Sequence, residues 1–288
     1  MMDIDVNLVD SKGKKHCFVE RVSELKFLKH ASFAGLGPNF AWVPAIFHTL
    51  GLAFHFGSKF SLKSDHIERT WPIIDPDDLR EMSRLTGRAV GDMFAKSHFG
   101  ARYTLCYEHA LHTKAIVQVG KSPDFYCIDR YGAKAFTVEA KGFSQCTIGH
   151  KQFAKHKAQS AASQLPIHYS VASVTHNIYN RITARVEDPE YENVPLDPSF
   201  SRSLIEEYFS TINARLHRFC EVTDEFQVGD TRYLAYDASP YLAPAPRGAV
   251  RVEYLVPREV PTGQPLDREI DNELSYFDVD GIGVRVSA

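Results

Sequence analysis

The sequence predicts an α/β protein, because segments with the apolar spacing of helices alternate with short runs typical of strands. Its 288 residues are 44% hydrophobic and 24% charged, which is the composition of an ordinary soluble globular protein. This length suffices for one large domain or two modest ones.

Charge and cysteine content limit the classes of function. The net charge is -3 at pH 7, and a nucleic-acid-binding domain is often strongly basic, so any surface for polyanions would have to be local. The five cysteines occur singly, without a C-x-x-C pair, which argues against a zinc ribbon and a disulfide framework. The N-terminus lacks the apolar core of a signal peptide, and we expect a cytoplasmic protein.

Residues 1–74 are expected to form an N-terminal lobe. Alternating apolar residues at 3–9 and an apolar run at 17–19 predict a hairpin. The most apolar stretch, residues 40–56, contains a proline and is shorter than the roughly 20 residues that cross a bilayer. It is therefore expected to be a buried helix.

Residues 75–186 contain the clearest succession of elements. Asp75 provides an N-cap, Pro76 follows in the first turn and two aspartates come next, which predicts a helix that runs to about Lys96. Strand-like runs follow, at 103–107, 115–119, 125–129 and 134–140. A second helix is expected at about 150–165, followed by a strand at 168–174.

Residues 187–288 are expected to form a C-terminal region, because acidic residues and prolines after 187 indicate an exposed connection. Its main element is one long amphipathic helix, whose apolar face is Leu204, Ile205, Tyr208, Phe209, Ile212 and Leu216. Strands are expected near 231–236 and 249–256, joined by a proline-containing loop at 241–248.

One predicted hairpin carries the residues most suited to chemistry. Two strand-like runs flank Tyr131-Gly132, and glycine tolerates the positive φ of a two-residue turn. In that register Asp124 lies opposite Glu139, and Lys141 shares their face, while the other face is apolar and belongs to the core. Opposed carboxylates repel unless a cation lies between them, and their oxygens suit Mg²⁺ or Mn²⁺.

The same residues resemble a known motif. Pro123-Asp124, followed after 14 residues by Glu139-Ala140-Lys141, resembles the motif of the PD-(D/E)XK nuclease superfamily, which includes restriction endonucleases and repair nucleases. The helices expected on either side of the motif also fit. Over residues 77–186 the resemblance implies a restriction-endonuclease-like fold, with a central mixed sheet flanked by helices and with N- and C-terminal additions.

The resemblance also implies an activity and roles for residues. It implies hydrolysis of phosphodiester bonds in nucleic acid, DNA more than RNA, by the nuclease subunit of a defence or repair complex. A helicase or ATPase would then be a separate partner. Asp124 and Glu139 would hold the metal with the Ala140 carbonyl, and Lys141 would position or activate the attacking water.

The chain departs from the superfamily pattern on the first helix. Many members place a glutamate there, where this chain has Gly91-Asp92. Either Asp92 or Glu108 would then supply the additional carboxylate to the metal, and the sequence leaves both open.

A run of basic residues follows the motif. No Asp or Glu occurs between Ala140 and Val186, whereas six basic residues do: Lys141, Lys151, Lys155, Lys157, Arg181 and Arg185. Such a local field could hold phosphates, with Lys151, Lys155 and Lys157 binding nucleic acid. A solvated basic face that compensates the acidic stretch after 187 explains the run equally well.

A different class of function is also compatible with the sequence. The chain could be a non-catalytic subunit that keeps the nuclease fold and uses residues 187–225 for protein–protein contacts. In that case the hairpin would carry only a surface salt bridge between its Asp, Glu and Lys.

Overall fold

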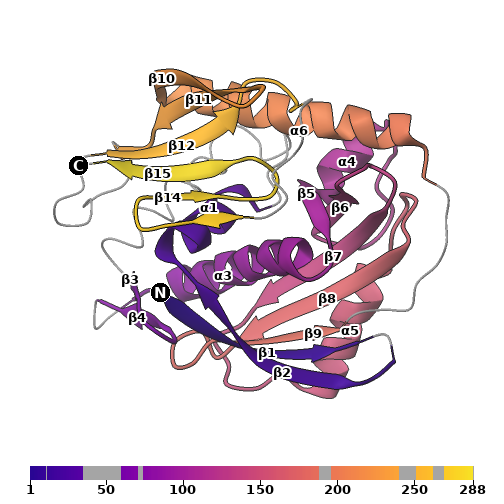
Figure 1. The fold of residues 1–288 in the computed structure, drawn as a ribbon. Helices are drawn as coiled ribbons and strands as arrows, with labels where there is room; N and C mark the ends of the chain where they lie inside the picture. The colour runs from indigo at the N-terminus through magenta and orange to yellow at the C-terminus, as the bar shows by residue number, and fades with distance from the viewer. Residues whose placement is uncertain are drawn as a thin grey trace.

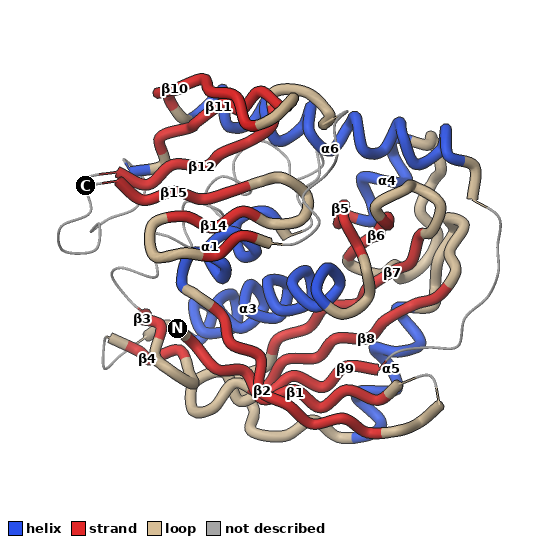
Figure 2. Tube along the Cα trace, in the orientation of Figure 1, coloured by secondary structure: helices blue, strands red, loops and turns tan. Residues whose placement is uncertain are grey.

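A computed structural model describes residues 1–10, 12–34, 60–70, 74–187, 196–239, 251–261 and 269–287. Within them the protein is a mixed α/β fold with a seven-stranded mixed sheet, a six-stranded antiparallel sheet, a two-stranded sheet and five helices (Figures 1 and 2). The helix expected at 40–56, the loop at 241–248 and most of the acidic connection after 187 lie outside the described residues. No helix in the described ranges is long and apolar enough to cross a membrane.

The seven-stranded sheet has the order β2-β1-β9-β8-β7-β6-β5. Its strands in chain order are β1 (Met2–Val9), β2 (Lys15–Val22), β5 (Ala101–Cys106), β6 (Phe125–Asp129), β7 (Ala135–Gly142), β8 (Tyr169–His176) and β9 (Thr183–Glu187). β1 pairs in parallel with β9, and β7 pairs in parallel with β8, whereas the other neighbours are antiparallel. The sheet therefore mixes both orientations.

Most expected strands are present, but one is wrong. The strands expected at 103–107, 125–129, 134–140 and 168–174 correspond to β5, β6, β7 and β8. The run at 115–119 is not a strand. Ala115 adopts a positive φ of 53° at the end of helix α4 (Tyr107–Thr113), and Val117 and Val119 are exposed rather than packed. Apolar residues alone do not make a strand where no neighbouring strand pairs with them.

The N-terminal hairpin forms as expected, with Met2 opposite Val22 and Val9 opposite Lys15. β1 also pairs with β9, so the hairpin extends the same sheet that contains β6 and β7. The sheet therefore crosses the boundary expected at residue 74. Strands β3 (Phe60–Leu62) and β4 (Ile67–Arg69) form a separate two-stranded antiparallel sheet.

The first long helix begins where local capping predicts. α3 spans Pro76–Ser97, and the side chain of its N-cap Asp75 accepts a hydrogen bond from the backbone N–H of Asp77 at 2.7 Å. α6 (Pro198–Phe219) starts in the same way, after Asp197, with a proline in its first turn. A helix cap depends on a few neighbouring residues, so the sequence around Asp75 and Asp197 indicates where α3 and α6 begin.

The helix after the motif is shorter than expected. α5 spans His150–Ser160 and ends five residues before Leu165. The backbone N–H of Gln164 donates to the Tyr107 hydroxyl instead of to a helix carbonyl. The segment between the end of α5 and Pro166 is therefore held by a tertiary contact.

The C-terminal region forms the second sheet, with strand order β10-β11-β12-β15-β14-β13. Its strands are β10 (Glu221–Val228), β11 (Thr231–Asp237), β12 (Arg251–Pro257), β13 (Ile270–Asp271), β14 (Ser275–Phe277) and β15 (Gly283–Ser287). β11 and β12 match two expected strands. β10 was not expected, because it is a mostly exposed edge strand rich in polar residues.

Figure 1 shows α3 lying between the two sheets, with α1 (Glu24–Phe33) beside the six-stranded sheet. α3 packs on β5, β7 and β8, and α5 packs on β7 and β8. Neighbouring residues on a strand point to opposite faces. Gly91 of α3 lies against Ala140, and His156 of α5 lies near Glu139, so the two helices cover opposite faces of β7.

Candidate active site

β6 and β7 pair in the register expected from the Gly132 turn. Phe125 lies opposite Val138, and Cys127 lies opposite Phe136, while Gly132 has a positive φ of 68°. Asp124 directly precedes β6, and its backbone N–H donates to the Val138 carbonyl at 3.0 Å. The hairpin therefore places Asp124 beside the end of β7 that carries Glu139 and Lys141.

Lys141 joins the two carboxylates. Its Nζ lies 2.8 Å from Asp124 Oδ2 and 2.8 Å from Glu139 Oε1. The backbone N–H of Ala140 also donates to Asp124 Oδ2, at 3.0 Å. The structure thus brings together the three residues of the predicted catalytic core, and the side chains of Asp124 and Lys141 are 18% and 29% exposed.

The face that carries Glu139 is buried, which corrects the expected division into a core face and an open face. Phe125 and Cys127 pack in the core against α3, as expected. On the other face, Thr137 Oγ1 donates to the carbonyl of Ser160 on α5 at 2.6 Å, and Glu139 itself is fully buried. A strand in the middle of a sheet with helices on both sides has no free face.

The Glu139 carboxylate is buried, and only one of its two oxygens is paired. Oε1 lies 2.8 Å from the Lys141 ammonium and 3.7 Å from Nδ1 of His156. Oε2 has no hydrogen-bond partner within the described ranges. Burial raises the pKa of Glu139, and the nearby Asp124 charge raises it further, while His156 and Lys141 oppose both effects. Buried polar atoms are seldom left unsatisfied, and an oxygen-ligated divalent cation would satisfy Oε2.

Arg88 of α3 is a site residue that the sequence reasoning missed. Its Nη1 lies 3.9 Å from Asp124 Oδ1, and its guanidinium carbon lies 5.2 Å from the centre of the Phe125 ring. Burial alone would raise the pKa of Asp124, but Arg88 and Lys141 hold it below its ordinary value. Asp124 is therefore an ionised carboxylate between two cations.

Two glycines bring Arg88 close enough to reach Asp124. A Cβ atom on Gly87 would lie 2.4 Å from the carbonyl carbon of Lys141, and one on Gly91 would lie 2.6 Å from the Ala140 Cβ. The backbone of α3 therefore packs directly on β7. Arg88 sits between glycines that are four residues apart on one helical face, and this pattern was the signal available in the sequence.

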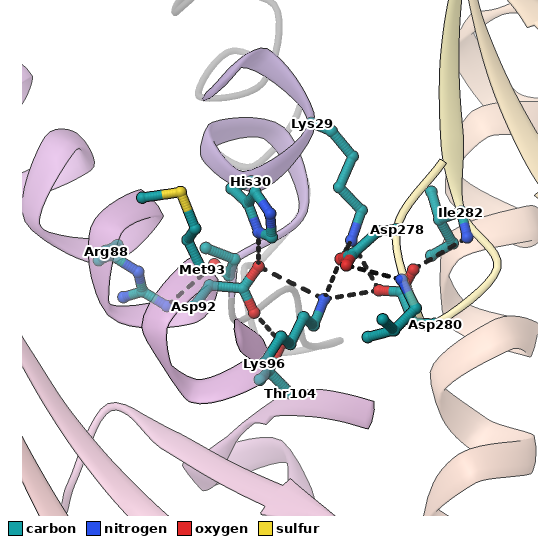
Figure 3. Close-up of polar contacts among 12 residues, drawn as sticks. Lys29, His30, Arg88, Asp92, Met93, Lys96, Thr104, Asp278, Asp280 and Ile282 are labelled. Atoms are coloured by element: carbon teal, nitrogen blue, oxygen red, sulfur yellow. Dashed lines mark hydrogen bonds and ion pairs between the residues drawn. The ribbon is translucent and has the colours of Figure 1, made fainter. Parts of the chain in front are cut away.

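Asp92 lies in a separate cluster. His30 Nδ1 is 2.6 Å from Asp92 Oδ2, Lys96 Nζ is 3.5 Å from the same atom, and Thr104 Oγ1 donates to Oδ1 (Figure 3). Burial alone would raise the pKa of Asp92, but Lys96 and His30 hold it far below its ordinary value. Both carboxylate oxygens are thus already in use, away from the contacts of Asp124 and Glu139.

Glu108 has a different environment. It lies exposed in the first turn of α4. The preceding residue, Tyr107, donates its backbone N–H to the Asp124 carbonyl at 3.1 Å. Of the two carboxylates left open by the sequence, Glu108 is the one whose chain segment bonds to Asp124.

The cluster around Asp92 joins α1, α3 and the turn between β14 and β15 (Figure 3). Lys96 Nζ lies 2.7 Å from Asp278 and 2.6 Å from Asp280, and Lys29 also contacts both of these aspartates. His30, Asp92 and Asp278 offer ligand atoms within 4.8 Å of one another, a spacing that suits a metal ion. The lysine ammonium groups already neutralise the same carboxylates, so the cluster acts as an internal ion network.

The basic run is partly paired in space. Lys157 and Arg185 each contact Glu187, at 2.9 and 2.8 Å, and Arg181 contacts Asp5 at 2.5 Å. Two carboxylates outside the run therefore pair with three of its cations. Lys151 and Lys155 are exposed on α5.

Comparison with models of known protein families, with curated proteins and with solved structures found no match.

Proposed function

We propose that this protein is a divalent-metal-dependent nuclease with a restriction-endonuclease-like fold, which hydrolyses phosphodiester bonds of nucleic acid, DNA rather than RNA. The observation that carries the proposal is the meeting of Asp124, Glu139 and Lys141 at a partly open site. Two carboxylates and one ammonium group, joined by contacts of 2.8 Å, are suited to metal-assisted phosphodiester hydrolysis.

The chemistry of the donors fits Mg²⁺ or Mn²⁺. Asp124 and Glu139 would hold the ion with the Ala140 carbonyl, and Glu108, which follows the Tyr107 that bonds to the Asp124 carbonyl, would add a carboxylate. The buried Glu139 Oε2, which has no hydrogen-bond donor among the described residues, supports this assignment. When bound, such an ion supplies charge neutralisation and activation of water.

Lys141 would act through its positive charge rather than as a base. Burial alone would lower its pKa, but Asp124 and Glu139 raise the pKa above its ordinary value. Lys141 therefore stays protonated near neutral pH. In that state it would orient the attacking water and stabilise the negative charge that develops on the phosphate, without removing a proton itself.

Nucleic acid would reach the site along α5. The buried side of this helix carries His156, next to Glu139, whereas Lys151 and Lys155 are exposed. Two positions four residues apart share one helix face, so both ammonium groups can contact successive phosphates. Lys157 contributes less in this proposal, because Glu187 already pairs with it.

The proposal includes a partner within a defence or repair complex. The sequence has no glycine-rich loop of the Walker type. Unwinding or translocation of DNA would therefore come from a separate helicase or ATPase.

The test is a cleavage assay on labelled single- and double-stranded DNA and RNA, with Mg²⁺, Mn²⁺ or EDTA. Wild-type protein should cut at least one substrate in the presence of a divalent ion, and neither EDTA-treated protein nor Asp124→Asn should cut. Folded wild-type protein that binds Mn²⁺ and cuts none of these substrates would instead support a non-catalytic subunit with protein–protein contacts.

A further inference from the structure

The guanidinium group of Arg88 is held in a fixed place beside the Asp124 carboxylate. Besides its contact with Asp124, its Nη2 donates to the carbonyl of Ala34, at the end of α1, at 3.4 Å. The ring of Phe125 lies against it. The helix that carries Arg88 is itself seated on β7 by Gly87 and Gly91.

We propose that Arg88 is a positioning residue that fixes the Asp124 carboxylate and limits the site to one divalent ion, which binds together with a substrate phosphate. This inference rests on the proposed function and goes beyond it, because it assigns a residue outside the motif and a metal stoichiometry.

The contacts of Asp124 are the first argument. Its Oδ2 accepts hydrogen bonds from the Ala140 N–H and the Lys141 ammonium, at 3.0 and 2.8 Å. Its Oδ1 faces Arg88. A site with two metal ions needs them about 3.5–4 Å apart around shared ligands. Among the contacts of the described residues, Oδ1 is the Asp124 oxygen without a hydrogen bond, and Arg88 lies beside it, so we infer that Asp124 does not bridge two ions.

The balance of charge is the second argument. When ionised, Asp124 and Glu139 carry two negative charges, and Lys141 and Arg88 carry two positive ones. One divalent ion therefore leaves a positive excess, which phosphates of the substrate offset. A second ion would double that excess in a partly buried site, where charges interact more strongly than in water. Binding of the single ion should consequently strengthen when substrate is present.

The test is calorimetric titration with Mn²⁺, with and without a DNA oligonucleotide whose phosphorothioate linkages resist cleavage. Wild-type protein should bind one Mn²⁺ per chain, more tightly when the oligonucleotide is present. Arg88→Gln removes a positive charge next to Asp124, so without oligonucleotide it should bind Mn²⁺ tighter, on the order of tenfold. Its cleavage rate should nevertheless fall by about a hundredfold, because Asp124 loses its fixed orientation.

Two further variants separate charge from folding. Arg88→Lys keeps the positive charge and should bind Mn²⁺ with nearly the wild-type affinity. Arg84→Gln changes an arginine one turn earlier on α3, which pairs with Glu81 at 2.6 Å, and should change neither Mn²⁺ affinity nor cleavage. Thermal melting of each variant reports folding. If Arg88→Gln fails to fold, the wild-type titration with the oligonucleotide still tests the stoichiometry of one ion per chain.

Two results would overturn the inference: two Mn²⁺ ions per wild-type chain with the oligonucleotide, or folded Arg88→Gln whose Mn²⁺ affinity is unchanged or lower. The proposed function fails differently. Suppose that wild-type protein binds one Mn²⁺, that Arg88→Gln binds Mn²⁺ more tightly, and that wild-type protein cuts no nucleic acid. This result would remove the nuclease proposal and keep the inference about Arg88. Wild-type protein that binds no Mn²⁺ under either condition would remove both.

Discussion

Gly87 lies against Gly142 with no room for a side chain on either residue. A Cβ atom on Gly87 would lie 2.3 Å from the backbone nitrogen of Gly142, and one on Gly142 would lie 1.6 Å from the carbonyl oxygen of Ser83. This contact sets the distance between α3 and β7. It therefore sets the position of Arg88 relative to Asp124.

Gly87→Ala should accordingly separate the helix from the strand. Because the clash is with backbone atoms, we expect a loss of about 1–3 kcal/mol in the free energy of unfolding and a lower cleavage rate. Denaturant unfolding and the cleavage assay measure the two effects. Gly149→Ala is the matched control, since a Cβ there meets no atom of the described residues within 4 Å. Equal losses in both variants would contradict the close packing of α3 on β7.

The exposed lysines of α5 are expected to bind phosphates. Lys151→Ala combined with Lys155→Ala should weaken nucleic-acid binding and reduce the slope of log affinity against log salt by about two, because about one counterion is released per phosphate contact. Fluorescence anisotropy at several salt concentrations measures this slope. The control replaces Lys12 and Lys14, both exposed at the β1–β2 turn. An unchanged slope in the α5 variant would place the binding surface elsewhere.

The ion network around Lys96 should be essential for stability. Lys96→Met would leave Asp92, Asp278 and Asp280 buried with fewer positive partners. Removing one partner of a buried ion pair typically lowers the free energy of unfolding by about 3–5 kcal/mol. Lys63→Met removes an exposed pair with Glu68 and should cost less than about 1 kcal/mol. Similar stability of these two variants would show that the network is dispensable.

The same network predicts a loss of stability in acid. The pKa values of Asp92 and Asp278 lie below their ordinary value of 3.8 in the folded protein, because lysine and histidine neighbours outweigh the effect of burial. Carboxyls of this kind stabilise the fold above their unfolded pKa, and this stabilisation is lost as pH falls through the lower folded values. Urea unfolding should therefore show a decline below pH of about 4, and a smaller decline in Lys96→Met. A curve that is flat from neutral pH to pH 3 would argue against ionised aspartates in the network.

Features that depend on a few neighbouring residues could be predicted from the sequence. The start of α3 follows from the Asp75 cap, and the register of β6 and β7 follows from the Gly132 turn. That register alone accounts for the meeting of Asp124, Glu139 and Lys141. Whether these residues act as a nuclease site remains a prediction.

Features that depend on packing between distant segments could not be predicted. Arg88 reaches Asp124 only because α3 touches β7, and Lys29 finds its partner Asp278 across most of the length of the chain. The burial of Glu139 depends on α5, which follows β7 but returns over its face. The spacing of apolar residues shows which face of a strand is apolar. It does not show which helix covers the polar face of that strand.

Glu139 and Lys141 should fail in different ways when each is replaced by Ala. Loss of Glu139 removes a carboxylate ligand, so Mn²⁺ affinity should fall together with cleavage. Loss of Lys141 leaves both carboxylates and removes a positive charge, so Mn²⁺ should bind at least as well while cleavage is lost. Calorimetry beside the cleavage assay shows the split. Equal loss of Mn²⁺ binding in both variants would mean that Lys141 supports the ligands rather than the reaction.

The most direct test of the nuclease site is the single-turnover cleavage rate of the double variant Asp124→Ala/Lys141→Ala, compared with wild type at saturating Mn²⁺. Both side chains are partly exposed, so we expect the variant to fold. We expect wild-type protein to cut labelled DNA and the double variant to be slower by at least about a hundredfold. A folded double variant that cuts at the wild-type rate would show that Asp124 and Lys141 are not catalytic.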